Sequence, residues 1–119
     1  MAVLVRQYRN GVFIGSVERD IQVTVINCAN VLPQASGING TNNFSINACA
    51  NQQTCFTINT SDADGAQNVT IDWDQSIPGA TFTQGTGSRP TGTFCWTPSQ
   101  ADIGSSTCFT ATVTDNACP

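Results

Sequence analysis

The sequence contains no histidine and no lysine, and its only basic side chains are four arginines. Without histidine, no Ser-His-Asp or Cys-His catalytic arrangement and no histidine-ligated zinc site can be built. Charged residues are 10% of the 119 residues and the net charge is −4. Nucleic acid and anionic membrane surfaces both require clustered Lys and Arg, so neither is an expected partner. These absences favour a protein without catalytic activity.

The chain also lacks the C-x2-C spacing typical of zinc ligands, although it has six cysteines. An even number of cysteines in a polar chain rich in Thr and Asn favours disulfides and an oxidising, extracellular compartment. The sequence does not determine which cysteines pair. The candidates are Cys28, Cys49, Cys55, Cys95, Cys108 and Cys118.

Long apolar runs are missing, and none approaches the ~20 residues that a membrane-spanning helix requires. No secretory signal is visible either, because Met1 is followed by AVLV and then directly by Arg6. A chain of extracellular character without such a signal is expected to be a fragment of a longer precursor.

Alternation of apolar and polar residues with a period of two dominates what is present, and it predicts an all-β protein. Residues 2–9 (AVLVRQYR) and 12–27 (VFIGSVERDIQVTVIN) are β-rich, and Asn10-Gly11 lies between them. Asn-Gly between two such runs is the strongest short signal for a β-hairpin. Residues 28–40, with Pro33 and two glycines, read as a loop and mark a boundary.

Short β-rich runs separated by turn residues follow this boundary. We expect strands at 44–48, 55–61, 68–74, 80–84, 93–97 and 108–115. Such a series predicts an antiparallel, immunoglobulin-like sandwich. The motif TCFT occurs at 54–57 and at 107–110. It either marks equivalent strands, B and F of a sandwich labelled A to G, or is coincidence in a Thr-rich chain.

The predicted strand count is incomplete for a seven-stranded sandwich. Residues 29–119 supply strands A to F and lack the seventh, while residues 1–28 supply a hairpin with no sheet of its own. The division is therefore 1–28, the terminal β-hairpin of a preceding repeat or a pair of donated strands, and 29–119, a repeat without its last strand.

The stretch DADGAQNVTIDWDQSIPGATF…RPTGTFCWTPSQADIG…CFTATVTDNACP resembles the immunoglobulin/cadherin-like repeats (putative Ig and dystroglycan-type cadherin families) of large bacterial surface adhesins. The opening VRQYRNGVFIGSVERDIQVTVINC is similar to the terminal hairpin of repeats in adhesins associated with gliding motility and type IX secretion. The resemblance implies an extracellular structural repeat that forms a stalk or filament, without catalytic activity.

Acidic residues are predicted to meet at one pole of this sandwich. Asp62 and Asp64 follow strand B, and Asp115 and Asn116 follow strand F. Strands B and F end at the same pole, so these four side chains are candidate oxygen ligands for Ca²⁺. The ion is similar to those that stiffen the joints between cadherin-like repeats. The alternative is that Asp-Gly and Asp-Asn are ordinary turn formers.

Two further features admit a functional and a structural interpretation. Asp72 and Asp74 share one face of a strand at about 7 Å, which suits paired acids of glycoside hydrolysis or a solvated outer face, and we favour the outer face. Trp73 and Trp96 suit a sugar-stacking platform, which makes a carbohydrate-binding module the alternative function. The alternation places both tryptophans in the core instead.

The predicted strands suggest two pairings, although they do not determine the connectivity. Cys55 and Cys95 both face away from the core on neighbouring strands, and Cys28 and Cys118 both lie at the acidic pole. The glycosylation sequons at Asn39, Asn43, Asn59 and Asn68 are explained by chance in a Thr- and Asn-rich chain.

The open edge beside strand F is expected to pair with a β-strand of a neighbouring repeat or an identical subunit. Ile21, Val23 and Val25 form the alternating apolar face best suited to this role. Docking within one chain and docking on the next chain both remain open, and surface polysaccharide is a further candidate partner of the adhesin.

Overall fold

The computed structural model describes residues 2–25, 27 and 29–117, and its strands are antiparallel. The only helical piece in this part of the chain is the short 3-10 turn η1 (Gln100–Asp102). The predicted all-β class is confirmed. The strands are β1 (Ala2–Arg9), β2 (Val12–Asp20), β3 (Gln34–Ile38), β4 (Thr54–Ser61), β5 (Val69–Trp73), β6 (Thr81–Gln84), β7 (Gly92–Trp96) and β8 (Ala111–Asp115).

Strands β1 and β2 form the predicted hairpin. Their register runs from Ala2 opposite Asp20 to Arg9 opposite Val12. Asn10 and Gly11 make the turn with φ of 50° and 80°. Two successive positive φ angles define the tight turns whose twist matches that of paired strands, and Asn-Gly tolerates them best. The ladder is shorter than the β-rich sequence, since the registered pairs end at Asp20 and residues 22–25 continue beyond them.

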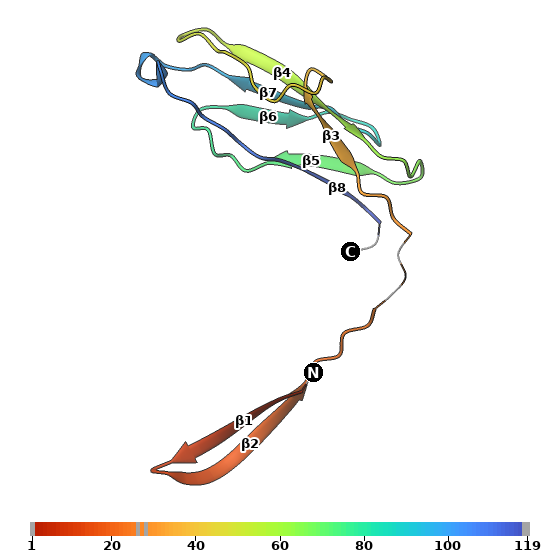
Figure 1. Cartoon of the computed structure of the whole chain (residues 1–119), viewed down its shortest axis with the longest axis vertical. Helices are drawn as coiled ribbons and strands as arrows, with labels where there is room; N and C mark the ends of the chain where they lie inside the picture. The colour runs from red at the N-terminus through yellow and green to blue at the C-terminus, as the bar shows by residue number, and fades with distance from the viewer. Residues whose placement is uncertain (1, 26, 28, 118–119) are drawn as a thin grey trace.

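The remaining strands form two sheets that face each other (Figure 1). One has the order β3-β4-β7-β6 and the other pairs β5 with β8. Alternate residues of both sheets point inward, as the sequence pattern predicts, and an aromatic stack joins them. The rings of Phe94 and Phe109 lie 4.5 Å apart, and those of Phe56 and Phe94 lie 5.0 Å apart. The most buried apolar side chains are Phe56, Ile58, Val69, Ile71, Ile77 and Phe94.

The first strand of the larger sheet lies elsewhere than predicted. Residues 44–48 are not a strand, and β3 lies inside the segment 28–40 that reads as a loop. The reason is local: the backbone at Gly37 lies so close to residues 41–43 that a Cβ there would be 2.3 Å from the carbonyl oxygen of Asn43. Gly37 and Ile38 donate to the carbonyls of Thr41 and Asn43, which turns residues 39–43 back on the strand.

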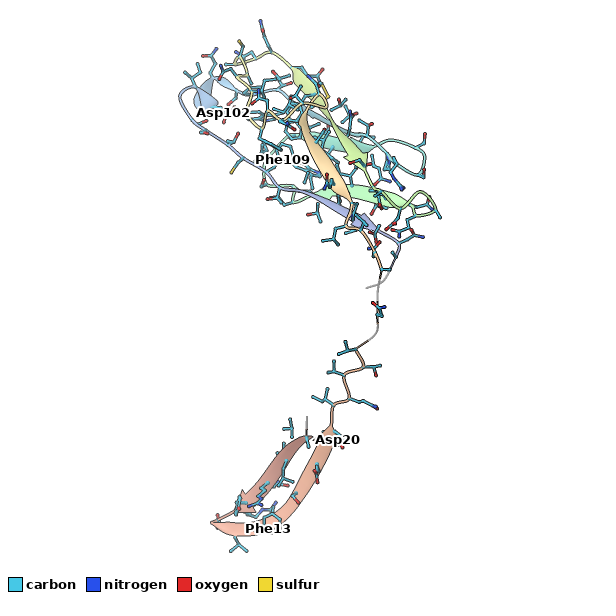
Figure 2. All side chains as sticks on the ribbon, turned by 45° about the vertical axis from the view of Figure 1, so that its right-hand side comes forward. Phe13, Asp20, Asp102 and Phe109 are labelled. Atoms are coloured by element: carbon cyan, nitrogen blue, oxygen red, sulfur yellow. A yellow bond between two sulfur atoms is a disulfide. The ribbon has the colours of Figure 1, made fainter. Side chains whose placement is uncertain are left out.

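The hairpin stands apart from the two sheets (Figure 1). The chain measures 69 × 42 × 22 Å with a radius of gyration of 23.2 Å, whereas a compact domain of this length has about 13–14 Å. Val3, Leu4, Val5, Tyr8, Val12, Phe13, Ile14 and Val17 of the hairpin are all exposed. Figure 2 shows Phe13 at the outer end of the hairpin, far from Phe109 in the sandwich.

Candidate functional site

The ends of β4 and β8, where the sequence predicts an acidic pole, are connected by a network of side-chain hydrogen bonds. Asn30 connects the two ends: its side-chain nitrogen donates to Asp115 Oδ2 at 2.9 Å, and its oxygen accepts from Gln67 Nε2 at 2.9 Å. Gln67 Nε2 also lies 3.2 Å from Asp64 Oδ2, which accepts from the backbone N–H of Val31 at 2.8 Å. These bonds tie the entry to β3, the β4–β5 connection and the end of β8 into one network.

Asn116 and Asp62 complete the predicted set at the same pole. Asn116 Oδ1 accepts from the backbone N–H of Asn68 at 2.7 Å. Asp62 Oδ1 accepts from the backbone N–H of Asp64 at 2.8 Å, an Asx turn that orients the loop. All four predicted residues therefore contribute to one end of the molecule, although each also has a structural hydrogen bond.

Arg89, in the connection between β6 and β7, is the cation of this pole and was not anticipated from the sequence. Its Nη2 donates to the backbone carbonyl of Asp64 at 2.6 Å and lies 4.0 Å from Asp62 Oδ2. Its Nη1 donates to the carbonyls of Gln67 and Ser88. The guanidinium thus braces the whole β4–β5 connection through backbone carbonyls, which Lys, a point charge, would satisfy less well.

Two buried oxygens at the pole have no hydrogen-bond partner among the described residues: Asp62 Oδ2 and Gln67 Oε1. The Asp62 side chain is 0% exposed. Buried polar atoms are usually paired, so each unpaired one calls for an explanation such as an ion or water. Within residues 2–25, 27 and 29–117, however, no three acidic, histidine or cysteine side chains are grouped closely enough to hold a metal ion.

One of the expected disulfides is present, between Cys55 on β4 and Cys95 on β7. The two residues are directly opposite in the register of these strands, with Cα atoms 4.2 Å apart. Cys49 and Cys108 are free and exposed. The suggested Cys28–Cys118 pair lies outside the described residues.

Asp72 and Asp74 lie on the outer face of the β5–β8 sheet, among threonines such as Thr70 and Thr112. Both are exposed, as expected of a solvated face. Hydrogen bonds from Ser76, its side chain foremost, and from Thr110 hold the pKa of Asp74 below its ordinary value. A lowered pKa keeps the carboxyl ionised, which is the opposite of what a general acid needs.

The two tryptophans belong to the core rather than to an exposed platform. Trp73 meets Phe94 and Phe109 edge-on, with ring centroids 5.7 and 5.8 Å apart. Trp96 also packs against the core cluster. A sugar-stacking surface requires the open face of an aromatic ring, so this packing does not favour the carbohydrate-binding alternative.

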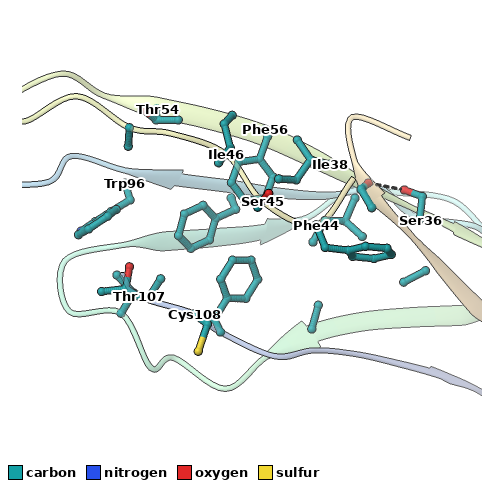
Figure 3. Close-up of a pocket in the computed structure, with 18 of the residues that line it drawn as sticks. Ser36, Ile38, Phe44, Ser45, Ile46, Thr54, Phe56, Trp96, Thr107 and Cys108 are labelled. Carbon is teal, nitrogen blue, oxygen red and sulfur yellow. Dashed lines mark hydrogen bonds between the residues drawn. The ribbon is translucent and has the colours of Figure 1, made fainter. Parts of the chain in front are cut away.

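An apolar groove of about 480 Å³ opens between the two sheets on the side of β8. Figure 3 shows Ile46 and Phe56 on one side of it and Thr107 and Cys108 on the other. Phe109 and Ala111 line it from the β8 side and are only half-buried. The groove borders the open edge of β8 at Ala111 and reaches the aromatic core, which the strand pattern alone does not reveal.

Strand β8 pairs with β5 on one side, and the strand orders of the described residues place no strand on its other side. Asp74 N–H bonds to the Thr110 carbonyl, so this pair is hydrogen-bonded and the pattern alternates along the two strands. The backbone N–H and C=O groups of Ala111 and Val113 consequently point to the open edge.

Comparison of the chain with family models, with curated proteins and with solved structures finds no match. In the described part of the chain, no helix is long and apolar enough to cross a membrane. The fold and the site therefore define a class only: an antiparallel two-sheet β protein with a disulfide, an open edge and an attached hairpin.

Proposed function

We propose that this chain is a non-catalytic structural repeat of an extracellular adhesin or surface filament, which acts as a stalk in cell-surface attachment or gliding. The observation that carries the proposal is the open groove beside β8, in a chain whose first strands form a hairpin outside the sandwich. An open strand edge is a template for pairing with a strand of another unit, as between neighbouring repeats of an array.

The strand order supports an immunoglobulin-like repeat. The sheet β3-β4-β7-β6 corresponds to strands A-B-E-D, and β5-β8 corresponds to C and F, so the strand absent from the seven-stranded arrangement is G. The Cys55–Cys95 disulfide supports an extracellular location, since disulfides persist in oxidising compartments. In this proposal, residues 1–28 are a hairpin that pairs with a neighbouring sandwich, and residues 29–119 are the immunoglobulin-like repeat.

The proposal predicts that the sandwich is stabilised by a supplied strand. We would append residues 20–27 (DIQVTVIN) after Pro119 through a short Gly/Ser linker. Burial of the two valines Val23 and Val25 is worth about 3–5 kcal/mol before ordering costs, so the midpoint of thermal unfolding should rise by about 5–10 °C.

Two matched control variants each carry two added negative charges, one variant on the apolar face of the appended strand and the other on its polar face. Changing the appended copies of Val23 and Val25 to Glu should abolish the rise, whereas changing those of Gln22 and Thr24 to Glu should preserve it. Equal melting midpoints of all three chains would show that the groove accepts no strand.

The proposal also predicts a location on the cell surface. Antibodies against the sandwich should label intact cells of the source organism, and labelling only after permeabilisation would contradict this location.

The same proposal includes a Ca²⁺ ion at the acidic pole, with Asp62, Asp64, Asp115 and Asn116 as ligands. The unpaired buried oxygens of Asp62 and Gln67 support it, because hard cations prefer such carboxylate and amide oxygens. Arg89 Nη2, at 4.0 Å from Asp62 Oδ2, is too far to use that oxygen in a hydrogen bond.

Calcium is therefore expected to raise the melting midpoint relative to a chelator. At a hundred times the dissociation constant the stabilisation is about 2.7 kcal/mol, or about 10 °C for a domain of this size. Asp62→Asn should remove the response, and Asp72→Asn, on the outer face, should retain it. If the wild-type chain has the same melting midpoint in calcium and in chelator, the proposed Ca²⁺ site is excluded.

A further inference from the structure

We propose that residues 22–25 (QVTV) of one chain insert as a β-strand along β8 of a second copy of this chain and close its apolar groove. The inference deepens the proposed function by naming the partner of the open edge, and it rests on that proposal in one respect, that the groove accepts a strand. It adds that separate chains associate head to tail without a covalent link.

The groove and the segment have complementary patterns. Beside β8, an inserted strand must present apolar side chains to Phe109, Phe56 and Trp96, and polar side chains to solvent. In residues 22–25, Val23 and Val25 lie on one face, while Gln22 and Thr24 lie on the other. Strand β8 has the same alternation (ATVTD), with Ala111 and Val113 facing inward and its threonines outward.

Insertion would bury apolar side chains of the segment that are now exposed to solvent. Val23 is 79% exposed and Val25 is 92% exposed, although both are strongly apolar and β-branched. Large apolar side chains of the hairpin, such as Phe13, Ile14 and Val17, are exposed as well. Burying such side chains against the groove is favourable, and open strand edges pair readily with other chains.

Charge distinguishes the hairpin from the sandwich in a way that favours association between copies. Residues 2–25 contain three arginines against one glutamate and one aspartate, and so carry a net positive charge. Residues 29–117 contain six aspartates and only Arg89, and so carry a net negative charge. Complementary charge accelerates and orients the encounter of two chains, and no such attraction would arise between two sandwiches alone.

Chain direction favours a second copy over insertion within one chain. Asn30 and Val31 are fixed at the acidic pole by hydrogen bonds to Asp115 and Asp64. Val25 precedes Asn30 by only five residues, so within one chain the segment would arrive at the pole together with β8 and lie parallel to it. A second copy can instead add the segment antiparallel, which matches every strand pairing among the described residues and is the slightly more stable arrangement.

Head-to-tail insertion does not close on itself, because the donor and the acceptor are different surfaces. Each chain that receives a strand still offers its own segment to the next chain, which generates open filaments. The filament repeats between separate chains the contact that a tandem array makes along one chain, and main-chain pairing gives it strength while the alternate side chains give it specificity.

The test compares the full wild-type chain with two variants of equal charge in light scattering coupled to size exclusion. The average molar mass of the wild-type chain should rise with concentration to at least twice the mass of one chain. Val23→Glu/Val25→Glu should stay monomeric, and Gln22→Glu/Thr24→Glu should assemble like wild type. Because the changes lie outside both sheets, circular dichroism should show the same sandwich in all three chains. Added Val23→Glu/Val25→Glu chains, which accept a strand but cannot donate one, should shorten wild-type assemblies.

A second measurement uses a synthetic peptide of residues 20–27 as the probe. It should bind the Val23→Glu/Val25→Glu chain and change the fluorescence of Trp96, and the peptide with the same two substitutions should not. Monomeric wild type at every concentration, or equal assembly of the two variants, would overturn the inference. If chains remain monomeric while the appended strand described above still stabilises the sandwich, the inference fails and the repeat proposal survives; if the appended strand also has no effect, both fail.

Discussion

Replacing Cys55 and Cys95 together with alanine should lower the free energy of unfolding by about 4 kcal/mol and the melting midpoint by about 20 °C. The disulfide closes a segment of 40 residues between β4 and β7. Cross-linking a loop of this length removes much of the conformational freedom of the unfolded chain. The bond also joins the two central strands of the larger sheet, so its loss acts on the strands that carry Phe56 and Phe94.

The measurement is chemical and thermal unfolding of the double variant beside Cys49→Ala, which removes a free, exposed thiol. The control should change the unfolding free energy by no more than about 0.5 kcal/mol. A thiol reductant should destabilise wild type to a similar degree and leave the double variant unaffected. A double variant as stable as wild type would show that the disulfide is dispensable and would weaken the case for an oxidising location.

In the presence of a chelator, Arg89→Gln is expected to cost about 3 kcal/mol, the lower part of the range for breaking a buried charge pair. The Arg89 side chain is 22% exposed, and Asp62 beside it is 0% exposed, so Asp62 would be left as a buried, uncompensated carboxylate. The substitution also removes donors to the carbonyls of Asp64 and Gln67, which loosens the β4–β5 connection.

A double-mutant cycle separates these two effects. Asp62→Asn/Arg89→Gln should be more stable than the sum of the single changes predicts, because the neutral amide no longer needs a cation. Arg19→Gln, on the exposed hairpin, is the matched control and should be nearly neutral. If Arg89→Gln and Arg19→Gln have the same free energy of unfolding, Arg89 does not stabilise the acidic pole.

Much of the fold follows from local sequence signals. The hairpin was predictable because Asn10-Gly11 tolerates two positive φ angles, and β5 because Val69, Ile71 and Trp73 alternate with polar residues. The Cys55–Cys95 bond was suggested because both residues face away from the core on neighbouring strands. Such signals involve few residues, and each agrees with the final structure.

Other features depend on contacts that no local pattern records. The position of β3 is set by Gly37, whose missing side chain permits a close backbone approach, while residues 44–48 have a strand-like alternation and yet form a wall of the groove. Arg89 lies in a loop rich in Gly, Ser and Pro, and nothing around it indicates that its guanidinium reaches the carbonyls of a different loop. The first result comes from a close backbone approach between residues 37 and 43, and the second from a contact between two loops that are distant in the sequence.

The central claim, that a strand from a second copy pairs with β8, is tested most directly by amide hydrogen exchange at Ala111 and Val113. Their N–H groups point to the open edge, so they exchange freely until a strand is added. In wild type at assembling concentrations they should exchange about a hundredfold more slowly than in the Val23→Glu/Val25→Glu chain, while Thr112, bonded to β5, should change little. Equal exchange of Ala111 and Val113 in the two chains at every concentration would contradict the account.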